Sequence, residues 1–98
     1  MPPVKPFSSV DAGLPGFQRS LRKLPPEIRS RANDAISDLL LEQIPGALDF
    51  KKLKGYKNPN VYTITIVGNH SYKLSLEVFD GVARLRRVGT HKEIDDHP

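Results

Sequence analysis

The residues best suited to chemistry lie near the C-terminal end of the sequence, where Val88-Gly89-Thr90-His91 follows a strand-like stretch. A histidine titrates close to neutral pH, so it can accept or donate a proton under physiological conditions. Cleavage of RNA by attack of a 2′-hydroxyl on the adjacent phosphate needs such a group, together with cations that stabilise the charge gathering on the phosphate. His91 is therefore a candidate general acid or base.

Cations that could serve this chemistry are concentrated in the second half of the chain. Residues 51–92 contain nine Lys or Arg and two Asp or Glu, whereas residues 1–50 contain six of each kind. This excess indicates a polyanionic partner, although a solvated basic surface would give the same composition. The candidate catalytic cations are Lys54, Lys73 and Arg84, and the candidate RNA-binding cations are Lys51, Lys52, Lys57, Arg86, Arg87 and Lys92.

The histidines also have purely structural interpretations. His91 could cap a strand end or hydrogen-bond the acidic residues that follow it, His70 is expected in a solvated turn, and His97 lies next to the last residue. The acidic residues within 93–96 could join a histidine in a metal site, but no spacing enforces one. We therefore expect neither a metal nor a cofactor, and the sequence contains no glycine-rich phosphate loop.

Length and composition indicate a single small domain. The chain has 98 residues, 38% hydrophobic and 27% charged, and it contains no cysteine, which excludes disulfides and thiolate metal sites. Its longest purely aliphatic run is Leu39-Leu40-Leu41, far too short to span a membrane or form a signal-peptide core. We expect a cytoplasmic protein without a membrane partner.

The spacing of apolar residues predicts two helices followed by three strands. Residues 1–16 are rich in proline and glycine and predict an extended arm or edge strand. A short helix is expected from Phe17 to Leu24, and a longer one from Pro26 to about Ile44. Period-two alternation then predicts strands over 61–67, 72–78 and 82–88, the last two joined by a tight Asp80-Gly81 turn.

These elements predict an α+β fold. Two N-terminal helices would pack on one face of a small antiparallel sheet of three or four strands and leave its other face open. Lys73 would lie on this open face, and strict alternation predicts that Arg84, Arg86 and Arg87 cannot all share it. Residues 94–98 are expected to form a flexible tail.

Several stretches taken together resemble the RelE/ParE toxin superfamily of bacterial type II toxin–antitoxin systems, in particular its RelE-like branch. They are LRKLPPEIRSRANDAISDLL, LDFKKLKGYKN, SYKLSLEVFDG and RLRRVGTHKEID, within residues 17–95. The resemblance implies a ribosome-dependent endoribonuclease that cuts mRNA without a metal and is neutralised by a cognate antitoxin protein.

The resemblance also assigns roles to residues. Lys52 and Lys54 match two lysines of the RelE-type connector, and Lys73 stands where many members have arginine. His91 matches a catalytic position that holds arginine or histidine, and Ile94 occupies a place where tyrosine is usual. Two alternatives remain open: a ParE-type poison of DNA gyrase without nuclease activity, and a catalytically silent relative that only binds its antitoxin.

Overall fold

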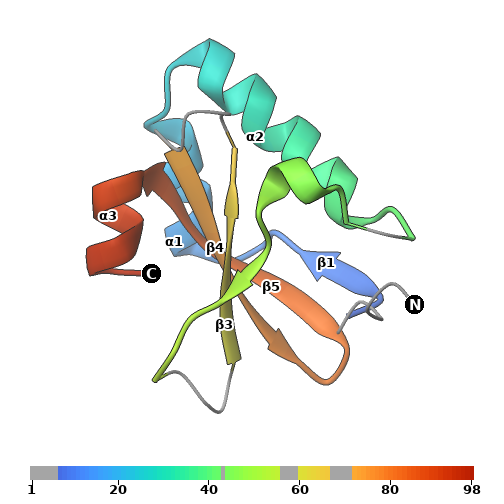
Figure 1. Cartoon of the computed structure of the whole chain (residues 1–98). Helices are drawn as coiled ribbons and strands as arrows, with labels where there is room; N and C mark the ends of the chain where they lie inside the picture. The colour runs from blue at the N-terminus through green and yellow to red at the C-terminus, as the bar shows by residue number, and fades with distance from the viewer. Residues whose placement is uncertain (1–6, 43, 56–59, 67–71) are drawn as a thin grey trace.

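A computed structural model describes residues 7–42, 44–55, 60–66 and 72–98. A five-stranded sheet, in the order β1-β5-β4-β3-β2, forms the centre of the fold (Figure 1). The elements are β1 (Ser9–Asp11), α1 (Pro15–Arg22), α2 (Pro26–Leu39), the 3-10 helix η1 (Gly46–Leu48), β2 (Lys51–Lys52), β3 (Asn60–Thr65), β4 (Tyr72–Phe79), β5 (Val82–Thr90) and α3 (His91–Asp96).

The predicted α+β class is confirmed, and the two N-terminal helices pack on the sheet. The predicted antiparallel meander is also present, as β3-β4-β5. The sheet is larger than expected and mixed, because β1 from the N-terminal arm pairs in parallel with β5 and the short β2 pairs with β3. Among the described residues, no helix is long and apolar enough to cross a membrane.

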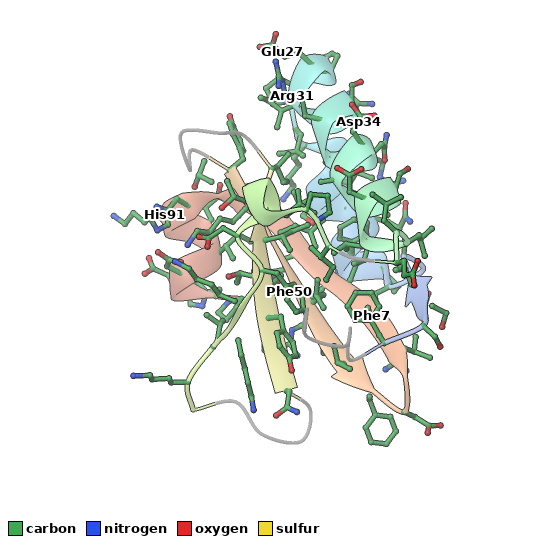
Figure 2. The ribbon with its side chains drawn as sticks, turned by 45° about the vertical axis from the view of Figure 1, so that its right-hand side comes forward. Phe7, Glu27, Arg31, Asp34, Phe50 and His91 are labelled. Atoms are coloured by element: carbon green, nitrogen blue, oxygen red, sulfur yellow. The ribbon has the colours of Figure 1, made fainter. Side chains whose placement is uncertain are left out.

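One face of the sheet and the two N-terminal helices enclose the main core. Phe17, Ala32 and Leu39 from the helices are buried against Leu74 and Leu85 of the central strands. A line of aromatic rings extends this core toward the edge of the sheet. Phe50 stacks on Tyr62 of β3 with 4.8 Å between ring centroids, and Phe7 lies 6.1 Å from Phe50 (Figure 2). These contacts hold the connector before β2 against the sheet.

The opposite face of the sheet, called here the α3 face, carries all three arginines of β5. Arg84 lies between the inward-facing Ala83 and Leu85, and Arg86 forms an ion pair with Glu77 of β4. Arg87 is paired in register with Ser75, which alternates with core residues and therefore faces away from the core.

A β-bulge explains this arrangement. Leu76 is opposite Leu85 while Ser75 is opposite Arg87, so β5 contains one residue more than β4 at this point. The extra residue places two arginines between the core positions Leu85 and Val88. The prediction that the three arginines cannot share a face is therefore wrong.

The C-terminal residues also differ from expectation. We expected residues 94–98 to form a flexible tail. Instead, residues 91–96 form α3, which packs against β4 and β5. Ile94 is 1% exposed, so burial of its side chain holds the helix on the sheet. The face that we expected to be open is therefore partly covered by α3.

Helix α1 replaces β1 along the second half of β5. β1 reaches only as far as Arg84, and beyond it the Val88 N–H donates to Ser20 Oγ on α1 at 3.1 Å. Ser20 Oγ in turn donates to the Phe17 carbonyl oxygen at 2.8 Å. This serine thus supplies the acceptor that a neighbouring strand would otherwise provide.

We expect Ser20→Ala to destabilise the fold by roughly 1–3 kcal/mol, because the Val88 N–H loses its acceptor in a part-buried position. Urea unfolding followed by circular dichroism measures this change. Ser30→Ala, on the exposed side of α2, is the matched control and should change the free energy of unfolding by less than about 0.5 kcal/mol. Equal effects of the two substitutions would contradict the role given to Ser20.

Candidate active site

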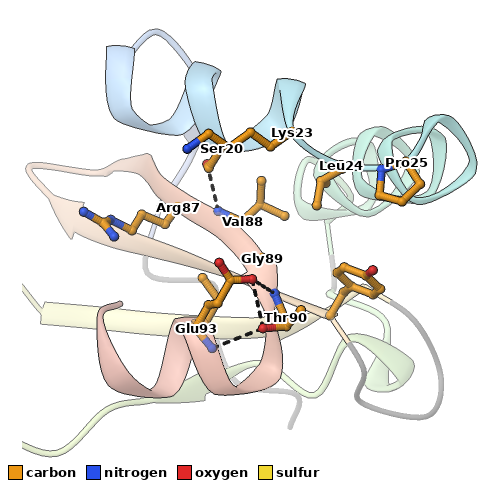
Figure 3. Close-up of a pocket in the computed structure, with 11 residues that line it drawn as sticks. Ser20, Lys23, Leu24, Pro25, Arg87, Val88, Gly89, Thr90 and Glu93 are labelled. Carbon is orange, nitrogen blue, oxygen red and sulfur yellow. Dashed lines mark hydrogen bonds between the residues drawn. The ribbon is translucent and has the colours of Figure 1, made fainter.

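A capping box turns the chain from β5 directly into α3. The Thr90 Oγ1 accepts a hydrogen bond from the Glu93 N–H at 3.3 Å, and Glu93 Oε1 accepts from the Thr90 N–H at 3.1 Å and from Thr90 Oγ1 at 2.9 Å (Figure 3). The Thr-x-x-Glu spacing is typical of a helix start. It makes His91 the first residue of α3.

Gly89 allows α3 to lie this close to the strand. A Cβ atom at this position would come within 3.2 Å of Glu93 Oε1 and 3.4 Å of Glu93 Cδ. A larger residue would therefore push on the side chain that closes the capping box. The Val-Gly-Thr sequence before His91 accordingly has a structural reason that does not depend on catalysis.

His91 and Lys73 meet at one carboxylate. The Lys73 Nζ lies 3.3 Å from Asp95 Oδ1, while the His91 Nε2 contacts Asp95 Oδ2 one helical turn away. The Lys73 side chain is only 15% exposed, whereas those of Asp95 and His91 are 46% and 50% exposed. Figure 2 shows His91 on α3, at the side of the molecule away from Phe7. This Lys73–Asp95–His91 group forms the candidate active site.

A pocket of about 250 Å³ lies beside the start of α3, between the end of α1 and the end of β5. Its polar lining includes Ser20, Lys23, Arg87, Thr90 and Glu93 (Figure 3). Leu24, Pro25, Val88 and Ile94 form apolar parts of the wall. Lys73, His91 and Asp95 are not among its lining residues, and the pocket meets the α3 face at Arg87.

The solved structures of known proteins include two close likenesses. One is the crystal structure of the RelB–RelE antitoxin–toxin complex from Methanococcus jannaschii, with 33% sequence identity and a TM-score of 0.66 over 87% of this chain and 96% of that one. The chain belongs to the RelE toxin family. The archaeal RelE–RelB complex from Pyrococcus horikoshii OT3 shares the fold, with 18% identity and a TM-score of 0.64 over 87% of this chain and 94% of that one. No family model and no curated protein matched the sequence.

The RelE-type residues singled out in the sequence are only partly brought together. His91 and Lys73 meet at Asp95, but Lys52 lies on β2, which is separated from β4 by β3. Lys52 is paired with the core-facing Tyr62 and is on the opposite face from Lys73. Lys54 is exposed in the turn after β2.

Strand β3 presents threonines to the α3 face. Thr65 is paired in register with Lys73, and Thr63 with Ser75. Both threonines are buried. Thr65 is therefore the β3 neighbour of Lys73 in this RelE-family chain, while Lys51 is paired with Thr63 and lies on the same face at the edge of the sheet.

The remaining predicted cations lie in several places. Lys51 pairs with Asp49 at 3.0 Å and Arg84 with Asp11 at 4.0 Å. Arg84 and His91 are seven residues apart on an extended strand, roughly 20 Å, so Arg84 does not join the His91 group. Arg87 and Lys92 form no ion pair with the residues that the structure describes. Lys57 and His70 lie outside the described residues.

The sequence did not single out two features of the site. We considered a contact of His91 with the acidic residues that follow it, and the structure shows that its partner is Asp95, four residues away on the same helix face. Ile94 was noted only because it stands where tyrosine is usual, and its burial makes it an anchor of α3. Within the described residues, no group of three His, Asp or Glu could hold a metal ion.

The capping box gives α3 a defined response to acid. Hydrogen bonds from the Thr90 backbone and side chain hold the pKa of Glu93 below its ordinary value of 4.5, with Lys23 adding a smaller effect in the same direction. A lowered pKa in the folded state means that this contribution to stability is present above pH 4.5 and is lost as the pH falls through the lowered value.

We expect α3 to fray as the pH is lowered below 4.5, which backbone chemical shifts of residues 91–96 measure by NMR. Glu93→Gln keeps an acceptor at this position but carries no charge, so the fraying should begin at a lower pH. Glu27→Gln, in the exposed first turn of α2, is the control and should leave the onset unchanged. An unchanged onset in Glu93→Gln would contradict the role of the carboxylate.

Proposed function

We propose that this RelE-family protein is the toxin of a type II toxin–antitoxin pair and inhibits translation by cutting mRNA on the ribosome. The observation that carries the proposal is the contact of His91 and Lys73 with the same carboxylate, which holds a proton-transfer group and a cation side by side. The reaction requires both kinds of group at one phosphate.

In the proposed reaction, the 2′-oxygen of one nucleotide attacks the phosphorus atom that follows it in the chain. The bond from phosphorus to the 5′-oxygen of the next nucleotide breaks, which leaves a cyclic phosphate and a free 5′-hydroxyl group. His91 either removes the proton of the 2′-hydroxyl or delivers one to the leaving 5′-oxygen. Lys73 stabilises the additional negative charge on the phosphate oxygens, and this reaction needs no metal ion.

The α3 face and the adjoining pocket offer contacts for the rest of the RNA. Arg87 projects from the α3 face and Lys92 is exposed on α3, so both can reach phosphates near His91. A pocket of about 250 Å³ suits a single nucleotide better than a larger ligand. We assign Lys51, Lys52, Lys54, Lys57 and Arg86 to phosphate contacts farther from the scissile bond.

An antitoxin partner is part of the proposal. The two solved relatives named above are complexes of RelE with RelB, and in the Methanococcus jannaschii complex RelB is the antitoxin and RelE the toxin. The excess of cations after residue 50 suits a partner with an acidic surface, because complementary charge accelerates association and favours the correct partner. Such a partner would compete with RNA for the same cations.

The first experiment maps mRNA 5′ ends in a translating extract containing the wild-type protein or His91→Ala. We expect cleavage by the wild type and a loss of roughly 10²–10⁴-fold in His91→Ala, since proton transfer contributes that much. His97→Ala, an exposed histidine after α3, is the matched control and should cut normally. Intact messages with the wild type would refute the proposal, and a block of DNA supercoiling would indicate a gyrase poison instead.

A second experiment separates Lys73 from Lys52. Lys73→Met should reduce cleavage by at least about 10-fold, because the cation beside His91 is lost. Lys52→Met should change it by less than about threefold, since Lys52 faces away from the α3 face. Turnover at saturating ribosome concentration is the measurement. A larger loss in Lys52→Met than in Lys73→Met would show that the connector lysine, and not Lys73, acts at the scissile phosphate.

A further inference from the structure

Within the part of the chain that the structure describes, Asp95 contacts both members of the candidate catalytic pair. Its two carboxylate oxygens are divided between them: Oδ1 lies 3.3 Å from Lys73 Nζ and Oδ2 contacts His91 Nε2. The second contact follows from the helix, because residues four apart lie on the same face of α3. The first requires α3 to lie over β4, where Lys73 is fixed by the sheet.

We propose that Asp95 is a positioning residue that fixes the orientation and tautomer of His91 and the position of the Lys73 ammonium group. A neutral imidazole meets the carboxylate with its Nε2–H donating, which leaves the lone pair of Nδ1 free to accept a proton. The base that receives a proton from the 2′-hydroxyl is then Nδ1. This assignment rests on the proposed function for its catalytic part.

The arrangement resolves a problem that a half-exposed histidine poses for catalysis. With 50% of its side chain exposed, His91 lacks the surrounding packing that would hold the ring in one rotamer. A hydrogen bond to Asp95 restricts both the rotamer and the tautomer. Removing an orienting carboxylate lowers the turnover of an enzyme through the wrong tautomer, even when the rest of the site is unchanged.

The same carboxylate matters to Lys73 for a different reason. The Lys73 side chain is largely shielded from water, and an ammonium group in such a place needs a partner. Asp95 supplies this partner while leaving the remaining ammonium protons available to a phosphate oxygen. The ammonium group and the imidazole are thereby held next to each other before RNA arrives, which lowers the cost of organising the site.

If Asp95 instead inhibited the reaction, its removal would change turnover in the opposite direction. If its carboxylate occupied the position of the scissile phosphate, it would act as an internal inhibitor, and its removal would increase RNA binding and turnover. A positioning residue that remains in place during the reaction gives a decrease in turnover with little change in RNA affinity. The two roles can therefore be separated by one substitution.

The test compares Asp95→Asn with Asp96→Asn. Both remove one negative charge from the last turn of α3, where a carboxylate opposes the helix dipole, so neither should weaken the helix. Asp96 forms no ion pair with the described residues. Turnover and KM are measured with programmed ribosomes, and the tautomer of His91 is read from its imidazole ¹⁵N shifts without RNA.

We expect Asp95→Asn to lower kcat by roughly 10–100-fold with KM changed less than about threefold, because the substitution perturbs orientation and not binding. Its neutral His91 should change from one tautomer with Nε2–H to a mixture. Asp96→Asn should match the wild type in every measurement, and unchanged methyl shifts of Ile94 would show that α3 remains docked.

Three results would overturn the inference: a higher kcat or tighter RNA binding in Asp95→Asn, an equal loss in Asp96→Asn, or an unchanged tautomer in Asp95→Asn. If the wild-type protein cuts no mRNA, the proposed function fails, and the imidazole shifts alone then decide whether Asp95 positions His91. The two failures are therefore distinguishable.

Discussion

The hydrogen bonds between Thr90 and Glu93 are the constraint on which the candidate site depends. They end β5 and start α3 without an intervening loop, so the direction of the helix is set by the strand before it. Burial of Ile94 then fixes which side of the helix faces the sheet. These two conditions bring Asp95 to a lysine that lies in the neighbouring strand β4. The position of a reactive side chain on this short surface helix is thereby fixed as closely as that of a side chain on a strand.

The sequence allowed the helices and the three long strands to be predicted because their apolar residues repeat with the period of each element over many residues. The same reasoning failed where a structure depends on one residue or on a distant partner. A single extra residue in β5 reverses the alternation at Arg86 and Arg87, and no periodic pattern reveals it. The three residues of β1 are too few to indicate pairing with β5. α3 is too short for a periodic signal, although its Thr-x-x-Glu start was readable.

The site residues divide in the same way. His91 and Lys73 were identified from residue type and from their places relative to strands, and both meet at the candidate site. Lys52 and Lys54 were matched by their place in the connector, but β2 lies at the edge of the sheet and is separated from β5 by β4 and β3. Asp95 was not distinguished from the other acidic residues after His91, because its contact depends on a helix that was not predicted. Residue type and position in the chain were therefore enough to identify candidate residues, but not the strand register that decides which of them come together.

The parallel pairing of β1 with β5 also governs how the protein can form. Strand β1 (Ser9–Asp11) cannot pair until Val82–Arg84 of β5 have been made, and these residues are far from it in the sequence. During vectorial synthesis the N-terminal residues emerge first, so α1 and α2 have no complete sheet to cover until β5 has been made. Contacts between residues so distant in sequence are slow to close. Helices α1 and α2 therefore cannot be fully covered before β5 has been made, and α3 with the candidate site follows β5 directly in the chain.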